Sequence, residues 1–539
     1  MKLNFTKERH TIAAFVPAVA TATTMLSGCS DATANSNRPN LLIIQTDEQS
    51  FRTLGCYRDL IPEDQAYVWG KEAKVETPNI DRIANEGMIC TNYYASSPVS
   101  TPSRASFQTG LYPVATGAPI NGMTMDANLT TYAERLRQEG YQTDFVGKWH
   151  LAGTPHVDKL YISPGFDFGY MDRSFVFETN HSKWYKVVGK PNEIVASNKV
   201  PDVVDPAMYS TDFLTNRCIE MLERDIKKDK PFCMMLSIPD PHSPNIGREP
   251  YTSMFGNMKI EKPKTMDSVA VASRPGWAVG GKNEAQKFNP NQVREYFAMI
   301  KCIDDNIGRV LDFLDENNLT ENTIVVFTSD HGDMMYEHHK MDKGNPYEAA
   351  AKIPFVIRYP NKIKAGKINR TSYTTCDFVP TILGLMGAEQ VEGVHGINDA
   401  TTYLNDKAEV TSDRIIYLTD SPFNSWTAAI DGRYKLVLSC RDTPWLFDLQ
   451  EDPSELINRY SDPECQEVAQ RLQAELLRQM ELYSEPALDL GIKYLLSADE
   501  KIEYVSPYEG KTLKEIIQIE KVTLDEAIYN MHKKCINKL

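Results

Sequence analysis

The chain has 539 residues, of which 42% are apolar and 24% charged, so it is long enough for two domains and for a large core. This composition excludes global disorder. The 73 acidic residues outnumber the 58 basic residues and give a formal net charge of -15. Because proteins that bind nucleic-acid phosphates carry a basic surface, we expect no nucleic-acid partner. The charge of an anionic substrate must therefore be met locally, by a few cations or a metal.

The N-terminus resembles a secretion signal. Basic residues precede a short apolar run over 11–26, which is too short to span a bilayer stably. The following Leu26-Ser27-Gly28-Cys29 resembles the bacterial lipoprotein box, which predicts a signal peptide over 1–28, a lipidated Cys29 and a tether over 29–38. The alternative is a plain cleaved signal with an incidental cysteine. The lipoprotein interpretation implies a location in the periplasm or at the outer-membrane surface of a Gram-negative bacterium, with membrane contact only through the lipid.

Strand and helix patterns alternate over 39–405. Apolar runs predict strands at 41–45, 144–146, 232–238, 323–328 and 355–359, and apolar periodicity predicts helices at 78–87 and 296–314. This alternation predicts an α/β fold with a large, mostly parallel sheet sandwiched by helices. The nine cysteines beyond Cys29 form no CxxC pair, so we expect neither a zinc site nor a disulfide framework.

The pattern changes after residue 405. Short strands are expected at 415–418, 426–430, 434–438 and 445–449, and a helix at 463–483. Asp431-Gly432 lies between two of these strands and is a hairpin signal. We therefore expect 39–405 to form the catalytic domain and 406–539 a smaller C-terminal α+β subdomain with an antiparallel sheet.

Ionisable residues follow four of the predicted strands. Asp47 and Glu48 follow the first, Lys148 and His150 the second, His242 the third, and Asp330 and His331 the fourth. Any one of these could be a surface loop, but the carboxyl ends of strands in an open α/β sheet are where ligands bind, so the four together predict one shared site. Carboxylates gathered there repel one another unless a cation lies between them, and hard oxygen donors suit calcium or magnesium. Taken alone, Asp47-Glu48 fits a solvated turn equally well.

The segment Ser97 to Gly110 carries the most specific pattern. Ser100 is expected just before a helix opened by Pro102, where free N–H groups favour an anion. Arg104, about one turn further, is expected to hold a negative group. The ordinary alternative is an N-cap serine before a helix. No neighbouring group in the sequence is evidently poised as a base for an unmodified Ser100.

The segment Ser100-Thr101-Pro102-Ser103-Arg104, with Thr109-Gly110, matches the signature of the sulfatase family, and the chain thus resembles a sulfatase of alkaline-phosphatase-like fold. The serine-type signature implies that a radical maturase oxidises Ser100 to formylglycine (3-oxoalanine), whose hydrate is the nucleophile. Ser96-Ser97-Pro98 is a competing frame, but no arginine follows it at the right offset.

The resemblance covers most of residues 38–460. It implies a calcium ion (Ca2+) held by Asp47, Glu48, Ser100, Asp330 and His331, a substrate sulfate bound by Lys148, His242 and Lys343, and a catalytic set of Ser100, Arg104, Lys148, His150, His242 and Lys343. Two positions depart from the family pattern. Glu48 stands where Asp or Gln is more common, so its ligation is less secure than that of Asp47. His331 stands where many members have Asn, and because a nitrogen donor is unusual for calcium, His331 can instead contact a substrate oxygen.

The implied reaction is nucleophilic catalysis through a covalent sulfate ester, in which His242 protonates the departing sugar oxygen and His150 helps to break down the intermediate. A sulfated glycan sugar is the expected substrate, although the sequence does not specify which sugar. Aromatic and charged residues in 175–185 and 421–426 are as consistent with pocket lining as with packing. The alternatives are a phosphodiesterase or phosphonate hydrolase of the same superfamily, and a non-catalytic glycan-binding lipoprotein whose Ser100 is never oxidised.

Overall fold

The computed structural model describes residues 38–152, 160–163, 168–170, 173–188, 194–202, 204–228, 230–279, 283–285, 287–420, 426–439 and 442–483. The expected signal peptide, Cys29, the tether up to residue 37, residues 421–425 and everything beyond 483 lie outside the described residues. Within the described part, no helix combines the length and the apolar character needed to span a bilayer. The seven cysteines among the described residues are free thiols.

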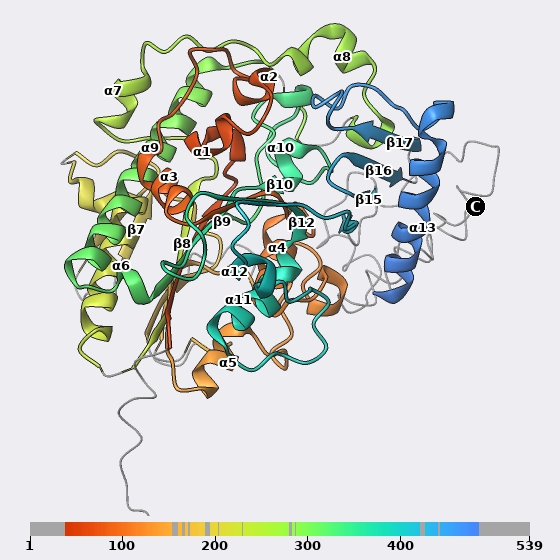
Figure 1. Cartoon of the computed structure of the whole chain (residues 1–539). Helices are drawn as coiled ribbons and strands as arrows, with labels where there is room; N and C mark the ends of the chain where they lie inside the picture. The colour runs from red at the N-terminus through yellow and green to blue at the C-terminus, as the bar shows by residue number, and fades with distance from the viewer. Residues whose placement is uncertain are drawn as a thin grey trace, which may run out of the picture. The chain divides into compact units, whose positions relative to one another are not determined.

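An eleven-stranded sheet forms the centre of the fold (Figure 1). Its four middle strands are neighbours in the order β9 (Thr323–Ser329), β1 (Asn40–Asp47), β8 (Phe232–Pro241) and β3 (Gln142–Lys148), and all four run parallel. Their register brings the carboxyl ends level, since Asp47 lies opposite Pro241 and Thr46 opposite Ser329. Whatever follows these four strands therefore meets at one edge of the sheet.

The remaining strands of this sheet extend it on both sides. Its order is β13-β12-β2-β11-β9-β1-β8-β3-β5-β4, with β10 beside β2. β11 is antiparallel to both of its neighbours, so the sheet is mixed but mostly parallel. The bounds are β2 Met88–Tyr94, β4 Leu160–Ser163, β5 Arg173–Phe177, β10 Lys352–Ile353, β11 Phe355–Arg358, β12 Lys367–Thr374 and β13 Glu409–Val410.

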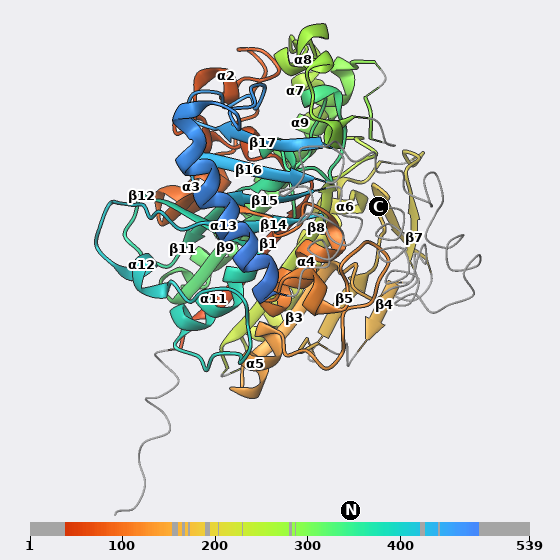
Figure 2. The ribbon, with the colours of Figure 1, turned by 90° about the vertical axis from the view of Figure 1, so that its right-hand side faces the viewer.

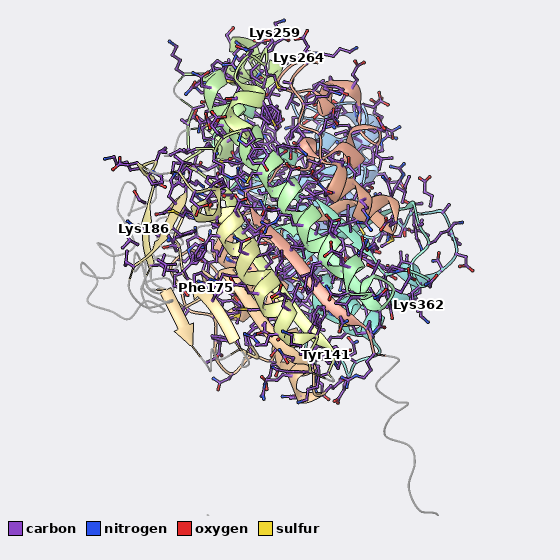
Figure 3. The ribbon with its side chains drawn as sticks, turned by 90° about the vertical axis from the view of Figure 1, so that its left-hand side faces the viewer. Tyr141, Phe175, Lys186, Lys259, Lys264 and Lys362 are labelled. Atoms are coloured by element: carbon purple, nitrogen blue, oxygen red, sulfur yellow. The ribbon has the colours of Figure 1, made fainter. Side chains whose placement is uncertain are left out.

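Helices cover both faces of the sheet because its strands are apolar on both sides. Along β1, Leu41 and Ile43 belong to one core cluster and Leu42 and Ile44 to the other, as the alternation of strand side chains requires. The first cluster contains residues of α4 (Ser100–Thr109), α5 (Tyr132–Gln138) and α11 (Phe378–Met386). The second contains residues of α3 (Pro78–Asn85), α6 (Ser210–Asp225) and α9 (Pro290–Glu316), and Figure 3 looks onto this face, where α6 and α9 cross the sheet side by side.

A second, four-stranded antiparallel sheet follows in the order β14 (Ile416–Thr419), β15 (Thr427–Ile430), β16 (Tyr434–Ser439) and β17 (Asp442–Asp448). The hairpin between β15 and β16 turns at Asp431-Gly432, where Gly432 has a φ of 97°, a conformation that favours glycine. Helix α13 (Gln466–Leu482) packs its Leu472 and Leu476 against one face of this sheet (Figure 2). The other face packs against the main body of the protein.

These two sheets and their helices confirm the predicted fold class. The domain boundary at 405 stays a prediction, and β13, which lies just beyond that boundary, pairs with β12 at the edge of the large sheet. The other described elements are α1 Gly55–Arg58, α2 Glu63–Ala66, α7 Tyr251–Phe255, α8 Ser268–Ala272, α10 Glu348–Ala351, α12 Ala400–Leu404 and the hairpin β6 Trp184–Val187 with β7 Ile194–Ser197.

Candidate active site

The four strand ends converge as expected. Asp47 is the last residue of β1 and Lys148 the last of β3, and the Lys148 ammonium contacts Asp47 Oδ2. Asp330 directly follows β9, and its Oδ1 accepts a hydrogen bond from the backbone N–H of Glu48, at 3.2 Å. Glu48 and His150, placed just beyond β1 and β3, have φ values of 65° and 61°. Non-glycine residues rarely adopt this left-handed conformation, which is found most often at functional sites.

Ser100 lies at the centre of this edge and is fully buried. Its Oγ is 3.0 Å from His331 Nε2, 3.3 Å from Lys343 Nζ and 3.5 Å from Asp47 Oδ1. The expectation that no base lies near Ser100 is therefore wrong, because His331, which is 231 residues away in the chain, is brought there by β9. Helix α4 also begins at Ser100 rather than at Pro102, because Val99 O already accepts the helical hydrogen bond from Ser103 N.

Arg104 lies one turn along α4 and is buried among the strand ends. Its guanidinium donates to Asp330 Oδ2 at 2.8 Å and to Ser237 Oγ at 2.8 Å. It also donates to Gln45 Oε1 at 3.1 Å and to Lys148 O at 3.2 Å. The negative group that it holds is therefore Asp330, and its contacts connect α4 to four neighbouring strands.

Three donor groups around Ser100 suit a metal ion. Carboxylate oxygens of Asp47 and Asp330 and a ring nitrogen of His331 lie within 4.8 Å of one another, and all three residues are fully buried. His331 Nδ1 lies 2.8 Å from Gly332 O, so Nδ1 carries the proton and the lone pair of Nε2 points toward Ser100. A backbone contact that fixes the tautomer in this way is the usual support of a histidine ligand. The donor set therefore fits a divalent cation.

Glu48 has a different position from the other expected ligands. Its carboxylate contacts the Lys343 ammonium, and His242 Nε2 lies 3.4 Å from its Oε1. The carboxylates that cluster with Glu48 are Asp333 and Asp342 rather than Asp47 and Asp330. Its proximity to Lys343 nevertheless keeps it at the border of the site.

The protonation states of the lysines and the carboxylates at this edge depend on one another. Burial raises the pKa of Asp47, but Lys148 and the other neighbouring positive and hydrogen-bonding groups together outweigh burial, so the pKa of Asp47 lies well below its ordinary value. Burial lowers the pKa of Lys148 to about 8, with Asp47 opposing that shift. Burial also lowers the pKa of Lys343, but the carboxylates of Glu48, Asp47 and Asp330 together outweigh burial and raise it, so Lys343 stays an ammonium.

The two expected catalytic histidines border the same space. His242 Nε2 lies 3.0 Å from Lys343 Nζ, and its Nδ1 lies 2.7 Å from Ser243 O. His150 Nδ1 is buried without a hydrogen-bond partner among the described residues. Burial, followed by the charge of Lys343 for His242 and of Lys148 for His150, holds the pKa of each imidazole well below its ordinary value. Both rings are therefore neutral when no anion is bound.

Sequence reasoning missed His181, which lies between β5 and β6. Its Nε2 is 3.3 Å from Asp47 Oδ2 and 3.0 Å from Lys148 Nζ. The sequence indicated this region only weakly, because residues 175–185 were as consistent with pocket lining as with packing. The aromatic residues of that segment, such as Phe175 and Tyr185, pack in the core, and the polar residues between them reach the site. At the other suggested lining segment, Trp426 is buried and donates from Nε1 to Gly344 O.

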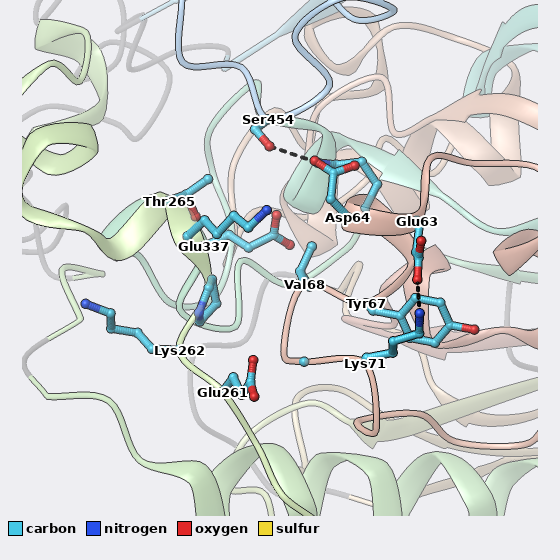
Figure 4. Close-up of a pocket in the computed structure, with 14 residues that line it drawn as sticks. Glu63, Asp64, Tyr67, Val68, Lys71, Glu261, Lys262, Thr265, Glu337 and Ser454 are labelled. Atoms are coloured by element: carbon cyan, nitrogen blue, oxygen red, sulfur yellow. Dashed lines mark hydrogen bonds and ion pairs between the residues drawn. The ribbon is translucent and has the colours of Figure 1, made fainter.

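A separate pocket lies between the α2 region and residues 261–265 (Figure 4), with a volume of about 540 Å³. None of the expected site residues lines it. Several of its charged groups have partners within the chain, such as Lys71 with Glu63 at 2.6 Å and Glu337 with Arg52 at 3.1 Å. The catalytic chemistry is therefore assigned to the edge around Ser100.

Comparison with known proteins agrees with this geometry. A family model described as Sulfatase matches residues 39–388, and one described as N-sulphoglucosamine sulphohydrolase, C-terminal, matches residues 336–481. The uncharacterized sulfatase YidJ of Escherichia coli (strain K12) is 28% identical, with 83% of this chain and 88% of that protein covered. The N-acetylglucosamine-6-O-sulfatase of Bacteroides thetaiotaomicron is 26% identical, with 87% and 90% covered. The solved structure of BT4656 in complex with its substrate D-glucosamine-2-N,6-O-disulfate superposes with a TM-score of 0.67 at 24% identity, with 83% of this chain and 98% of that one covered.

Proposed function

Because this chain belongs to the sulfatase family and is a sulfuric ester hydrolase, we propose that it removes sulfate from a sulfated sugar through a nucleophile made from Ser100. One observation carries the proposal. The buried Ser100 Oγ lies within 3.5 Å of Asp47 at the end of β1 and of His331 and Lys343, which both follow β9. The sugar is proposed because a relative that covers most of the chain is an N-acetylglucosamine-6-O-sulfatase.

We propose that Ser100 acts as formylglycine, formed by a radical maturase that binds the chain transiently. A formylglycine hydrate supplies a nucleophilic oxygen and a second hydroxyl that expels sulfate afterwards, which an unmodified serine lacks. His331 Nε2, at 3.0 Å, is the one described imidazole nitrogen in hydrogen-bond contact with Ser100 Oγ. If its lone pair is committed to a metal ion, it is not available as a base for plain serine, which favours the modified residue.

The sulfatase family binds a metal ion, and we propose calcium here, held by Asp47, Asp330 and His331 together with the Ser100 side chain. The compact, fully buried donor set and the fixed tautomer of His331 support a metal ion, and the carboxylate oxygens of Asp47 and Asp330 favour calcium. When bound, calcium polarises the nucleophile and a sulfate oxygen. Glu48 completes the set only if it exchanges its contact with Lys343 for the ion.

The chain's own residues have separate proposed roles. Lys148, Lys343 and His242 hold sulfate oxygens, since their nitrogens surround the space beside Ser100. His242 also protonates the leaving sugar oxygen. Because its ring is neutral in the free site, the bound anion must first raise its proton affinity. His150, with its unpartnered Nδ1, accepts a proton during release of sulfate, and Arg104 keeps Asp330 in place.

The decisive experiment combines mass spectrometry with turnover. Protein produced with and without an anaerobic radical maturase is measured on a panel of defined sulfated sugars, beginning with N-acetylglucosamine 6-sulfate, and on a phosphate diester and a phosphonate monoester. We expect sulfate release in proportion to the fraction of Ser100 present as formylglycine. Faster turnover of the phosphorus esters would establish the alternative hydrolase. If fully modified protein turns over none of these substrates, the result would favour a non-catalytic glycan-binding role.

We also propose that Cys29 carries a lipid that anchors the enzyme to the bacterial envelope. The support is the Leu-Ser-Gly-Cys sequence after a basic and then apolar N-terminus. Growth with an alkyne-tagged fatty acid should label the wild-type protein, and Cys29→Ser should abolish the label. Equal labelling of both proteins would disprove the anchor at this residue.

A further inference from the structure

The loop between β5 and β6 carries a histidine into the active site that no motif identifies. His181 Nε2 lies 3.0 Å from the Lys148 ammonium and 3.3 Å from Asp47 Oδ2. It therefore reaches the two charged groups that β3 and β1 deliver to the site. A sulfate oxygen held by Lys148 is within the same reach of this imidazole.

The ring of His181 also lies flat on His242. The two ring centroids are 3.8 Å apart and their planes differ by 5°. Such a stacked contact fixes the plane of each ring. His242, the proposed proton donor, is thus held by Ser243 O at its Nδ1 and by His181 across its face.

A buried ion pair ties this loop to the His242 segment. Lys183, two residues after His181, donates to Asp240 Oδ1 at 2.6 Å and to His242 O at 2.8 Å. The other oxygen of Asp240 accepts hydrogen bonds from Ser210 and Thr211 of α6. Because Lys183 and Asp240 are both fully buried, the two histidines are positioned by one shared support.

Exposure indicates which part of the substrate meets His181. The floor of the site, formed by Ser100, Asp47 and Lys148, is fully buried. The side chains of His242 and His181 are 15% and 21% exposed. The Lys343 side chain is also 15% exposed, so a substrate whose sulfate reaches the floor leaves its sugar beside His181, His242 and Lys343. Among the described residues, nothing forms a hydrogen bond with His181 Nδ1, so this nitrogen is open to a ligand.

We propose that His181 is a substrate-contacting residue that binds a hydroxyl of the sulfated sugar through Nδ1 and holds His242 in plane through its ring. This inference rests on the proposed sugar sulfatase function and adds to it a determinant of sugar binding. It divides one side chain into two separable contributions. Nδ1 contributes only to the binding of substrates that have a hydroxyl beside the sulfate. The ring contributes to the turnover of every substrate whose leaving group needs a proton from His242.

Three variants separate these contributions. His181→Phe keeps a flat ring for stacking and removes both nitrogens, His181→Ala removes both features, and His339→Asn is the control. His339 is partly exposed and contacts Glu284, at 4.0 Å, instead of the groups around Ser100. The fraction of Ser100 present as formylglycine is measured for each variant. The kcat and KM are then determined for the best sugar of the panel and for 4-nitrophenyl sulfate, which has no sugar hydroxyl.

We expect His181→Phe to raise KM for the sugar roughly 3- to 10-fold more than it raises KM for 4-nitrophenyl sulfate, because only the sugar loses the hydrogen bond from Nδ1. A loss common to both substrates measures the contact of Nε2 with Lys148 and Asp47. His181→Ala should also lower kcat on the sugar, because His242 loses its support. His339→Asn should match the wild type. Calorimetry in a Ser100→Ala background should show the same loss of sugar affinity for His181→Phe without any turnover.

The outcomes distinguish this inference from the proposed function. If the wild type releases sulfate from sugars and His181→Phe is equal to it in KM and in calorimetric affinity, the His181 contact is wrong and the function stands. Equal losses on the sugar and on 4-nitrophenyl sulfate would make His181 a structural residue, which also overturns the inference. If the modified wild type turns over no sulfated sugar, the proposed function fails first and the inference fails with it.

Discussion

The protein buries two clusters in which positive and negative side chains lie together. One surrounds Ser100 at the carboxyl edge of the large sheet, and the other surrounds Lys435 of the small sheet. The Lys435 ammonium has three oxygen partners, Glu348 Oε1 at 2.7 Å, Glu455 Oε1 at 2.8 Å and Pro346 O at 2.8 Å. An ammonium has three protons to donate, so the chain itself satisfies this cation. The cluster joins β16 to α10 and to the loop after β17.

The cluster around Ser100 is different because the chain does not complete it. His150 Nδ1 and both amide atoms of Gln49 are buried without hydrogen-bond partners among the described residues. Lys148, Lys343 and Arg104 each contact a carboxylate of the chain, so the incompleteness lies in these neutral polar groups. Buried polar groups are normally satisfied, and an unsatisfied set at the end of several strands indicates a missing ligand. The two clusters therefore differ in whether the chain itself provides a partner for every buried polar group. It does so for the cation of the structural cluster and not for all groups of the catalytic one.

The largest expected effect comes from the nucleophile. Ser100→Ala should lose turnover of every sulfate ester while keeping the unfolding midpoint, because only one hydroxyl is removed. The measurements are sulfate release and thermal unfolding. In parallel, Ser103→Ala should lower activity in proportion to its formylglycine fraction. If protein with only unmodified Ser100 works at full rate, the formylglycine mechanism is wrong.

Asp330→Ala should remove bound calcium and turnover together, because Asp330 is one of the three clustered donors and also holds Arg104 at 2.8 Å. Elemental analysis of the purified variant gives the calcium content. Full calcium occupancy in this variant would remove Asp330 from the proposed metal site, whatever the activity.

His242→Ala should lower kcat on sugar sulfates by roughly 10²- to 10⁴-fold, the usual contribution of a general acid. The loss should be much smaller with 4-nitrophenyl sulfate, since nitrophenolate leaves without a proton. Steady-state kinetics on both substrates test this. Losses of the same size on both would limit His242 to binding sulfate.

The smallest effect on catalysis is expected at the completed cluster. Lys435→Ala leaves Glu348 and Glu455 buried without their shared cation, which should cost about 3–5 kcal/mol of unfolding free energy. The kcat of the folded fraction should not change. Chemical denaturation and active-site titration measure the two quantities. A variant with wild-type stability but reduced kcat would contradict the division between the clusters.

Local patterns in the sequence were sufficient for the four central strands and for the small sheet, but they predicted neither β2 nor β12 nor α6. The apolar runs of β1, β3, β8 and β9 were recognisable because strands buried on both faces are continuously apolar. The Asp-Gly turn between β15 and β16 was recognisable because few residue pairs fit such a turn. The start of α4 was placed two residues too late, because the first helical bond depends on Val99 O and not on the proline.

The sequence by itself determined which residue types follow each strand, and therefore that Asp47, Lys148, His242 and Asp330 would meet if the strands were neighbours. Only the tertiary structure decided that they are neighbours, in the order β9-β1-β8-β3, and that His331 lies next to Ser100. It also placed His181 in the site. The position of His181 depends on its stacking with His242 and on the ion pair between Lys183 and Asp240, which are 57 residues apart in the chain. Contacts between residues far apart in the chain leave no periodic or local trace in the sequence, so this part of the site required the folded chain.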